Sequence, residues 1–199
     1  MILGLTGNIA AGKSTVAQAL ARRGALVVDA DQLARDVVAA GSPVLAQLVA
    51  RFGRQILQAD GSLNRELLGR LVFADEEARS ALNRIMHPAI AELARKTLAV
   101  LRKRSDIPLV VYEAPLLFEA GAEKRVDKVL LVRIDPEVQL QRLMERNGFD
   151  EHEARRRIAA QLGQDEKAAR ADFIIDNSGT PAELDRQLDR LWPELTAGR

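Results

Sequence analysis

The segment that most constrains this chain is a glycine-rich loop near its amino terminus. Residues 7–15 read GNIAAGKST and match the phosphate-binding pattern GxxxxGK[ST]. The apolar run at residues 2–6 before the loop is typical of a strand buried on both faces, and residues 16–21 after it favour a helix. Backbone N–H groups of such a loop point at phosphates, and the positive end of the following helix adds to the attraction. The segment therefore predicts a site for a nucleoside triphosphate.

Two side chains of this loop carry specific chemistry. Lys13 supplies a mobile positive charge for the phosphates, and Ser14 offers its hydroxyl to Mg²⁺ that arrives with ATP. The alternative is a glycine-rich turn that binds no ligand. The flanking strand and helix argue against this alternative. We expect the nucleotide to lie against the loop residues Asn8, Ala10, Ala11, Gly12, Lys13, Ser14 and Thr15.

Composition narrows the class of protein. The 199 residues are 47% hydrophobic, which is ample for a core. A formal net charge of +1 and an aromatic content of 4% argue against nucleic acid as a partner. No apolar stretch is long enough to span a bilayer, no cationic leader precedes the first strand and cysteine is absent, so we expect a cytoplasmic protein without a membrane partner. The sequence assigns no oligomeric state.

Further apolar runs alternate with helical patterns. Candidate buried strands lie at residues 26–28, 109–112, 128–134 and 173–175, and each ends at or near a carboxylate. Helices are predicted to begin at Pro136 after Asp135, and at Pro181 after Thr180. This alternation predicts an α/β fold with a five-stranded parallel sheet flanked by helices, whose ligands bind beyond the carboxyl ends of the strands.

Two helical excursions interrupt this pattern. Residues 32–104 contain no strand-like run, only helical segments at 44–52, 65–73, 76–86 and 89–101, so they predict an inserted helical lobe. Residues 136–170 are helical and rich in arginine, which suggests a lid. The nucleotide-binding core then comprises residues 1–31, 105–135 and 171–199.

Asp31 is the candidate general base. Asp29 and Asp31 follow the second strand, and their spacing places both carboxylates on one side if the chain is still extended there. Alternatively, one or both cap a helix that begins near Gln32. Arg35 lies four residues after Asp31, so on a helix it pairs with Asp31 or with a substrate phosphate, and spacing favours the internal ion pair.

Other charged residues have both functional and structural interpretations. Glu113 ends the third strand, where a carboxylate can contact Mg²⁺ through water or simply be solvated. Arg142 and Arg146 share part of a helix face and either clamp a triphosphate within a closing lid or remain solvated. His87 precedes Pro88, a pair that often marks a helix boundary, and a structural or acceptor-side role is favoured over proton transfer.

Taken together, motifs along nearly the whole chain resemble the dephospho-coenzyme A kinase family. They are GLTG at 4–7, DADQLAR at 29–35, FG at 52–53, DGSLNR at 60–65, His87-Pro88, PLLFE at 115–119, Arg142-Leu143 with Arg146, Gln161, and ADFIIDN at 171–177. The resemblance implies a P-loop kinase that uses ATP and Mg²⁺ to phosphorylate the ribose 3′-hydroxyl of dephospho-coenzyme A, the last step of coenzyme A synthesis.

Several roles follow from the resemblance rather than from spacing. It makes Asp31 the base, Arg142 and Arg146 lid arginines, and Asn177 a neighbour of the adenine. It also places Arg35, His87 and Leu116 at the border of the acceptor. The chain departs from the family at Asn8 and Ala10, where glycine is usual, and at Glu113, where aspartate is usual. A positive φ would strain Ala10 more than Asn8.

Two other functions compete with this interpretation. A kinase on the same scaffold for another small acceptor, such as a nucleotide or a sugar acid, carries the same phosphate loop. A guanine-nucleotide switch would need an NKxD motif and a DxxG loop, and neither occurs in the expected place.

Overall fold

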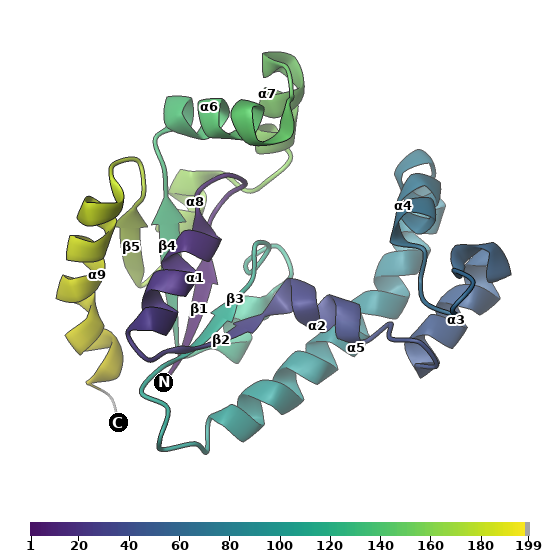
Figure 1. Ribbon diagram of the computed structural model, residues 1–199, viewed down its shortest axis with the longest axis horizontal. Helices are drawn as coiled ribbons and strands as arrows, with labels where there is room; N and C mark the ends of the chain where they lie inside the picture. The colour runs from purple at the N-terminus through teal and green to yellow at the C-terminus, as the bar shows by residue number, and fades with distance from the viewer. Residues whose placement is uncertain (198–199) are drawn as a thin grey trace. The chain divides into compact units, whose positions relative to one another are not determined.

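The computed structural model describes residues 1–197, and the chain folds into two compact units. The first unit comprises Met1–Asp29 and the chain from Val100 onward, and the second comprises Ala30–Ala99. The second unit thus covers most of the helical insertion expected at residues 32–104. The segment expected to form a lid, residues 136–170, belongs to the first unit (Figure 1).

The first unit is built on a five-stranded parallel sheet with the order β2-β3-β1-β4-β5 (Figure 1). Its central strand is buried at every position, as expected for a parallel strand covered on both faces. The number and direction of the strands agree with the sequence prediction. Each strand begins and ends within one residue of the predicted position. The strands are β1 (Ile2–Thr6), β2 (Leu26–Asp29), β3 (Val110–Glu113), β4 (Lys128–Arg133) and β5 (Phe173–Asp176).

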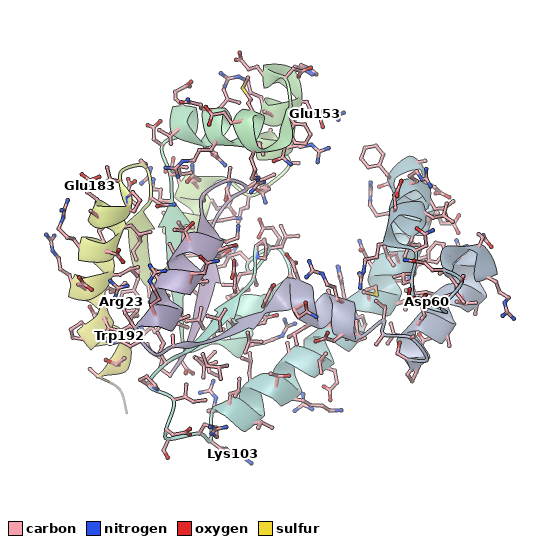
Figure 2. The ribbon with its side chains drawn as sticks, viewed as in Figure 1. Arg23, Asp60, Lys103, Glu153, Glu183 and Trp192 are labelled. Carbon is pink, nitrogen blue, oxygen red and sulfur yellow. The ribbon has the colours of Figure 1, made fainter. Side chains whose placement is uncertain are left out.

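Two helices, α1 (Lys13–Arg22) and α9 (Pro181–Thr196), contribute to the core on one face of this sheet. Alternate residues of β1, Leu3 and Leu5, are buried in that core together with Leu20 and Leu188. Trp192 of α9 packs against the same cluster (Figure 2). The predicted capping box is present at the start of α9, where Thr180 and Glu183 exchange hydrogen bonds.

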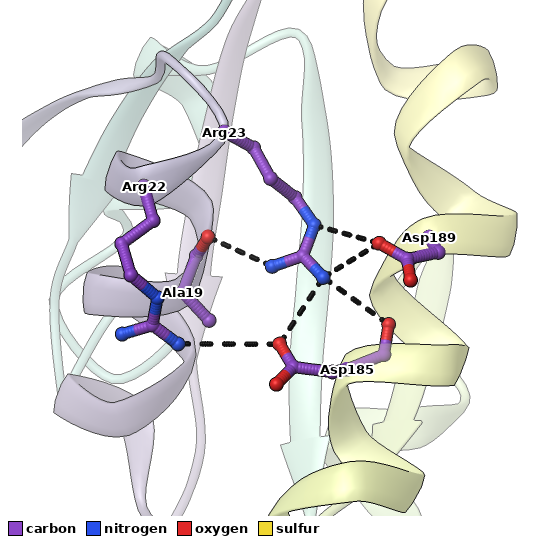
Figure 3. Close-up of polar contacts among 5 residues, drawn as sticks. All are labelled: Ala19, Arg22, Arg23, Asp185 and Asp189. Carbon is purple, nitrogen blue, oxygen red and sulfur yellow. Dashed lines mark hydrogen bonds and ion pairs between the residues drawn. The ribbon is translucent and has the colours of Figure 1, made fainter.

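Arg23 ties α9 to the end of α1. Its guanidinium donates to Asp189 Oδ1 from Nε at 3.1 Å and from Nη2 at 2.6 Å (Figure 3). It also donates to Asp185 Oδ1 at 3.1 Å and to the Ala19 carbonyl oxygen at 3.0 Å. Only 17% of the Arg23 side chain is exposed, so this is a partly desolvated network rather than a loose surface pair.

Three short helices follow β4: α6 (Pro136–Asn147), α7 (Glu151–Ala159) and α8 (Gln164–Ala168). Asp135 caps α6 as predicted, because its carboxylate accepts from the N–H groups of Glu137 and Val138. A 3₁₀ turn, η2 (Ala122–Arg125), lies earlier, between β3 and β4.

The second unit is helical. Its core is formed by apolar residues of successive helices, among them Leu45, Leu48, Ile56, Leu68 and Ala81. Side-chain caps begin two of the helices, Ser42 before α3 and Asn64 before α4. The elements are α2 (Ala30–Asp36), α3 (Pro43–Phe52), η1 (Arg54–Ile56), α4 (Arg65–Ala74) and α5 (Glu76–Leu101), the last of which ends in the first unit.

The structure corrects two local predictions. The helix boundary expected at His87-Pro88 is wrong, because α5 runs through Pro88 without a break and is 26 residues long in all. An internal proline costs about 3 kcal/mol because it removes one main-chain hydrogen bond and crowds the preceding turn. The remaining hydrogen bonds of so long a helix, with the packing of Ala78 and Ala81, outweigh this local loss. Helix α2 also begins at Ala30 rather than near Gln32, so Asp31 is helical and not extended.

None of the helices within residues 1–197 has both the length and the apolar character needed to cross a membrane.

Candidate nucleotide-binding site

The phosphate loop joins β1 to α1 at the carboxyl end of the central strand, which has β3 on one side and β4 on the other. In open parallel sheets this edge is where ligands bind. Two of its glycines are required by close approach of other groups. A Cβ at Gly7 would lie 2.6 Å from the carbonyl oxygen of Val132. A Cβ at Gly12, whose φ is 85°, would collide with the side-chain nitrogen of Asn177. The loop therefore fits its surroundings only with glycine at these positions.

Ala10 adopts a left-handed conformation with φ of 62°, alone among the non-glycine residues in the described part of the chain. This conformation costs a residue with a Cβ roughly 1–2 kcal/mol. Asn8, the other departure from the family's glycines, does not have a positive φ. The strain expected from the sequence is therefore confined to Ala10.

Lys13 and Ser14 begin α1 and face different groups. The Lys13 ammonium donates to the carbonyl oxygen of Gly7 at 2.8 Å and lies 3.4 Å from that of Asn8. Ser14 Oγ donates to Glu113 Oε1 at 3.2 Å. The structure thus brings together the hydroxyl and the carboxylate that the sequence proposed for the metal. Both are hard oxygen ligands of the kind that Mg²⁺ prefers.

A cavity of about 660 Å³ lies beside the loop. Its lining includes Lys13, Ser14, Thr15, Arg142, Arg146 and Asn177, all of them predicted to contact ATP. Ala10 and Gly12 also line it, whereas Asn8 and Ala11 are buried beside it. The structure therefore assembles most of the predicted nucleotide residues from three separate segments of the chain.

Asn177 and the two arginines are held by defined contacts. The side chain of Asn177 donates to the carbonyl oxygen of Ala11 at 2.8 Å, so it supports the loop directly. Arg142 Nη1 donates to the main-chain oxygen of Asn177 at 2.8 Å. Arg146 donates to the neighbouring Asn147 side chain at 2.9 Å. Arg142 is therefore anchored at the cavity by a residue distant in the chain, whereas the hydrogen bond of Arg146 is to its neighbour in sequence.

The tip of the loop is bonded to the segment predicted as a lid. The N–H of Ile9 donates to Gln161 Oε1 at 2.7 Å, and the carbonyl oxygen of Ile9 accepts from Gln139 at 2.8 Å. Asn8 adds a bond from its side-chain nitrogen to the carbonyl oxygen of Leu162 at 3.1 Å. Ile9 and Ala10 also pack against the apolar cluster of α6 and α7 that includes Leu140, Leu143 and Ala154.

Sequence reasoning missed Gln139, and it named Gln161 only as part of the family resemblance. One signal was present. Gln139 lies four residues before Leu143, so it falls on the apolar face of α6, where a polar side chain needs a buried partner. In the structure Gln139 is 1% exposed and finds that partner at Ile9.

Lys167 of α8, within the segment expected to form a lid, is fully buried. Its ammonium lies 2.8 Å from Glu119 Oε1. Burial alone would raise the pKa of the Glu119 carboxyl, but the hydrogen bond and charge of Lys167, together with main-chain hydrogen bonds, hold the pKa below its ordinary value. This ion pair fastens the PLLFE segment to α8. On that segment Leu116 is half exposed, while Leu117 and Phe118 are buried.

The remaining acceptor candidates belong to the second unit. Asp31 and Arg35 lie one turn apart on α2, and both are exposed. Arg35 donates to Gln32 Oε1 at 3.2 Å. His87 is exposed on α5, beside a cavity of about 450 Å³ that Arg79 and Arg84 also line.

Comparison with known proteins gives a consistent result. A sequence model of the family described as dephospho-CoA kinase matches residues 1–183. A dephospho-CoA kinase of Geobacter sulfurreducens is 52% identical over 191 residues, covering 96% of each chain. Two solved structures are similar over at least 98% of each chain. A Thermus thermophilus protein has 37% identity with a TM-score of 0.79, and the dephospho-CoA kinase of Campylobacter jejuni has 28% identity with a TM-score of 0.78. This chain, with its phosphate loop and the cavity beside it, belongs to the dephospho-CoA kinase family.

Proposed function

We propose that this protein transfers the γ-phosphoryl group of ATP to the ribose 3′-hydroxyl of dephospho-coenzyme A, giving coenzyme A and ADP. The observation that carries the proposal is the cavity beside the phosphate loop, in which Lys13, Ser14 and Arg142 converge. Membership of the dephospho-CoA kinase family supports this choice of acceptor.

ATP is bound by the loop's main chain and by three cationic side chains. Main-chain N–H groups at the start of α1 and the positive end of that helix attract the phosphates. Lys13 exchanges its contact with the Gly7 carbonyl oxygen for phosphate oxygens, which bear full negative charge. Arg142 and Arg146 approach the same phosphates from α6 and stabilise the charge that develops during transfer.

The residues beside the loop fit a bound Mg²⁺. Ser14 would hold the ion through its hydroxyl, and Glu113 through a water molecule, because the two side chains already lie within hydrogen-bonding distance of each other. When bound with ATP, Mg²⁺ neutralises charge on the β- and γ-phosphate oxygens.

Asp31 acts as the general base. It accepts the proton of the ribose 3′-hydroxyl while that oxygen forms its bond to the γ-phosphorus and the bond from phosphorus to the bridging oxygen of ADP breaks. Asp29 is paired in register with Glu113 at the carboxyl edge of the sheet. Covalent geometry keeps the Cα of Asp31 within roughly 7 Å of that of Asp29, because only two peptide units separate them.

The acceptor is bordered by Arg35, His87 and Leu116. Asn177 lies beside the adenine of ATP while its side chain supports the loop. The proposed location is the cytoplasm, where ATP is the phosphoryl donor. No nucleic-acid partner is proposed, because the net charge of +1 provides little general attraction for a polyanion.

The test is incubation of the purified protein with Mg-ATP and a panel of acceptors, with product masses as the readout. The panel includes dephospho-coenzyme A, nucleosides, nucleotides and sugar acids. We expect the mass of one phosphoryl group to be added to dephospho-coenzyme A, with ADP formed in equal amount. Phosphorylation of a different acceptor in preference to dephospho-coenzyme A would refute the proposal.

A further inference from the structure

Residues 161–167 follow α7, include most of α8 and are bonded to the tip of the phosphate loop; we call this segment the brace. Gln161 Oε1 accepts from the N–H of Ile9 at 2.7 Å. The carbonyl oxygen of Leu162 accepts from the side-chain nitrogen of Asn8 at 3.1 Å. Two consecutive residues of the brace therefore hold two consecutive residues of the loop.

A buried ion pair anchors the other end of the brace. The Lys167 side chain is 0% exposed, and its ammonium lies 2.8 Å from Glu119 Oε1. Within residues 1–197 this ammonium has no hydrogen-bond acceptor besides that carboxylate. A buried charge without a partner is strongly destabilising, so Lys167 occupies this position only because Glu119 lies beside it.

Glu119 also contacts the end of the brace that holds the loop. Its Oε1 accepts from the N–H of Leu162 at 3.4 Å. The main chain of Leu162 is thus held from both sides, its N–H by Glu119 and its carbonyl oxygen by Asn8. One carboxylate oxygen therefore joins the buried Lys167 to the residue that supports the loop tip.

The middle of the brace is attached to the sheet without any charge. Gln164 exchanges two hydrogen bonds of 3.0 Å with the main chain of Ile134, the residue after β4. These bonds do not involve Glu119 or Lys167. The brace should therefore stay attached when the ion pair is removed, which allows the ion pair to be tested in a folded protein.

The tip of the phosphate loop needs such support. Ala10 has a φ of 62°, a strained conformation that persists only where surrounding contacts hold it. A loop that is ordered before its ligand arrives also binds more tightly, because binding then orders fewer groups. We propose that Glu119, fixed by Lys167, is a positioning residue that keeps this loop in the form that binds phosphates, acting through the main chain of Leu162. The inference rests on the proposed function, because it takes the loop to bind ATP.

Two double variants isolate the bond from Leu162 to Glu119. Glu119→Gln with Lys167→Met removes both charges and keeps a side-chain oxygen that can accept from the N–H of Leu162. Glu119→Leu with Lys167→Met removes both charges and that oxygen as well. Neither leaves a buried charge unpaired, so both should fold. If the variant with Glu119→Leu does not fold, Glu119→Ala with Lys167→Met lacks the same oxygen and replaces it.

Calorimetric titration with ADP measures the effect. The first double variant should bind ADP within about twofold of wild type. The second should bind ADP roughly fivefold more weakly, the factor that corresponds to one net hydrogen bond. In steady-state kinetics its KM for ATP should rise by a similar factor while kcat stays within about twofold, because bound nucleotide orders the loop again. A loss of stability alone would not separate KM from kcat in this way.

Lys128→Met is the matched control. Lys128 forms an ion pair of 2.7 Å with Asp172, but at the amino end of β4, the opposite edge of the sheet from the phosphate loop. This variant loses a lysine and an ion pair of similar length, and it should keep wild-type affinity for ADP.

Equal affinity of the two double variants for ADP would overturn the inference, as would a fall in kcat with an unchanged KM for ATP. The titration with ADP needs no acceptor, so it is independent of the reaction. If wild type binds ADP but does not phosphorylate dephospho-coenzyme A, the proposed function fails, while a roughly fivefold difference between the double variants would still support the role of Glu119.

Discussion

Arg142 Nη1 donates a hydrogen bond to the main-chain oxygen of Asn177 at 2.8 Å. The side chain of Asn177 in turn supports the carbonyl oxygen of Ala11 in the phosphate loop. The contact joins α6 to the residue that follows β5, and it holds the guanidinium at the wall of the nucleotide cavity. An arginine that is already in position before ATP binds needs little reorganisation to stabilise the charge that develops in the transition state.

Arg142→Ala should therefore slow turnover more than it weakens ATP binding. We expect kcat to fall roughly 10²-fold, the scale for removing one pre-positioned donor, with a several-fold rise at most in the KM for ATP. Steady-state kinetics with both substrates provide the measurement. Arg155→Ala, which removes an exposed arginine paired with Glu151 on α7, is the control. Equal effects of the two substitutions would argue against a catalytic role for Arg142.

Asp31→Asn should remove the proposed general base while keeping the size of the side chain. We expect kcat to fall by roughly 10²-fold or more, with ATP affinity largely retained. Asp36→Asn is the control, because Asp36 is on the same helix and contacts the side chain of Gln32. Kinetics at saturating ATP and acceptor measure the effect. An unchanged kcat would exclude Asp31 from proton transfer.

Lys13→Ala should impair both binding and turnover, because the proposed function has the ammonium contact the phosphates before and during transfer. We expect a higher KM for ATP and a kcat roughly 10²-fold lower. Lys103→Ala, at an exposed position outside the cavity, should have no effect (Figure 2). Calorimetric titration with ADP separates the loss of binding from the loss of turnover. Wild-type ADP affinity and turnover in Lys13→Ala would contradict the site.

Ala10→Gly and Ala11→Gly should have opposite effects on stability. Glycine at residue 10 relieves the left-handed strain, worth roughly 1–2 kcal/mol, although loss of the half-buried methyl group and greater unfolded-state entropy offset part of the gain. Glycine at residue 11 removes a buried methyl from an unstrained position and should destabilise. Thermal unfolding of the three proteins gives the comparison. A lower midpoint for Ala10→Gly than for wild type would show that packing outweighs strain.

Gln161→Ala should loosen the loop tip by leaving the N–H of Ile9 without its side-chain partner. The lost hydrogen bond should cost about 1 kcal/mol of stability. Because the loop is then less ordered before ATP binds, ADP should also stabilise the variant less than it stabilises wild type. Gln141→Ala is the control, since Gln141 is exposed on the same segment and donates to Glu145 within α6. Equal stabilisation of Gln161→Ala and wild type by ADP would assign Gln161 a purely structural role.

Local sequence patterns predicted the phosphate loop, the five parallel strands and the caps at Asp135 and Thr180. Each of these features depends on residues that are neighbours in the chain, so the spacing and type of residues suffice to predict it. The interruption expected at Pro88 was wrong because a local preference was outweighed by the hydrogen bonds and packing of a 26-residue helix. The extended conformation considered for Asp31 was wrong for a similar reason, since α2 begins directly after β2.

The sequence by itself determined that this chain carries a triphosphate-binding loop on a parallel sheet, because backbone geometry and apolar periodicity are properties of short segments. Only the tertiary structure decided which distant polar groups meet. Ile9 and Gln161 are 152 residues apart, and Asn177 reaches Ala11 across 166 residues. Such pairs form where folding removes water from both partners, because a buried donor or acceptor must then find another protein group. The burial of Lys167 against Glu119 has the same origin, and no spacing in the chain signals it.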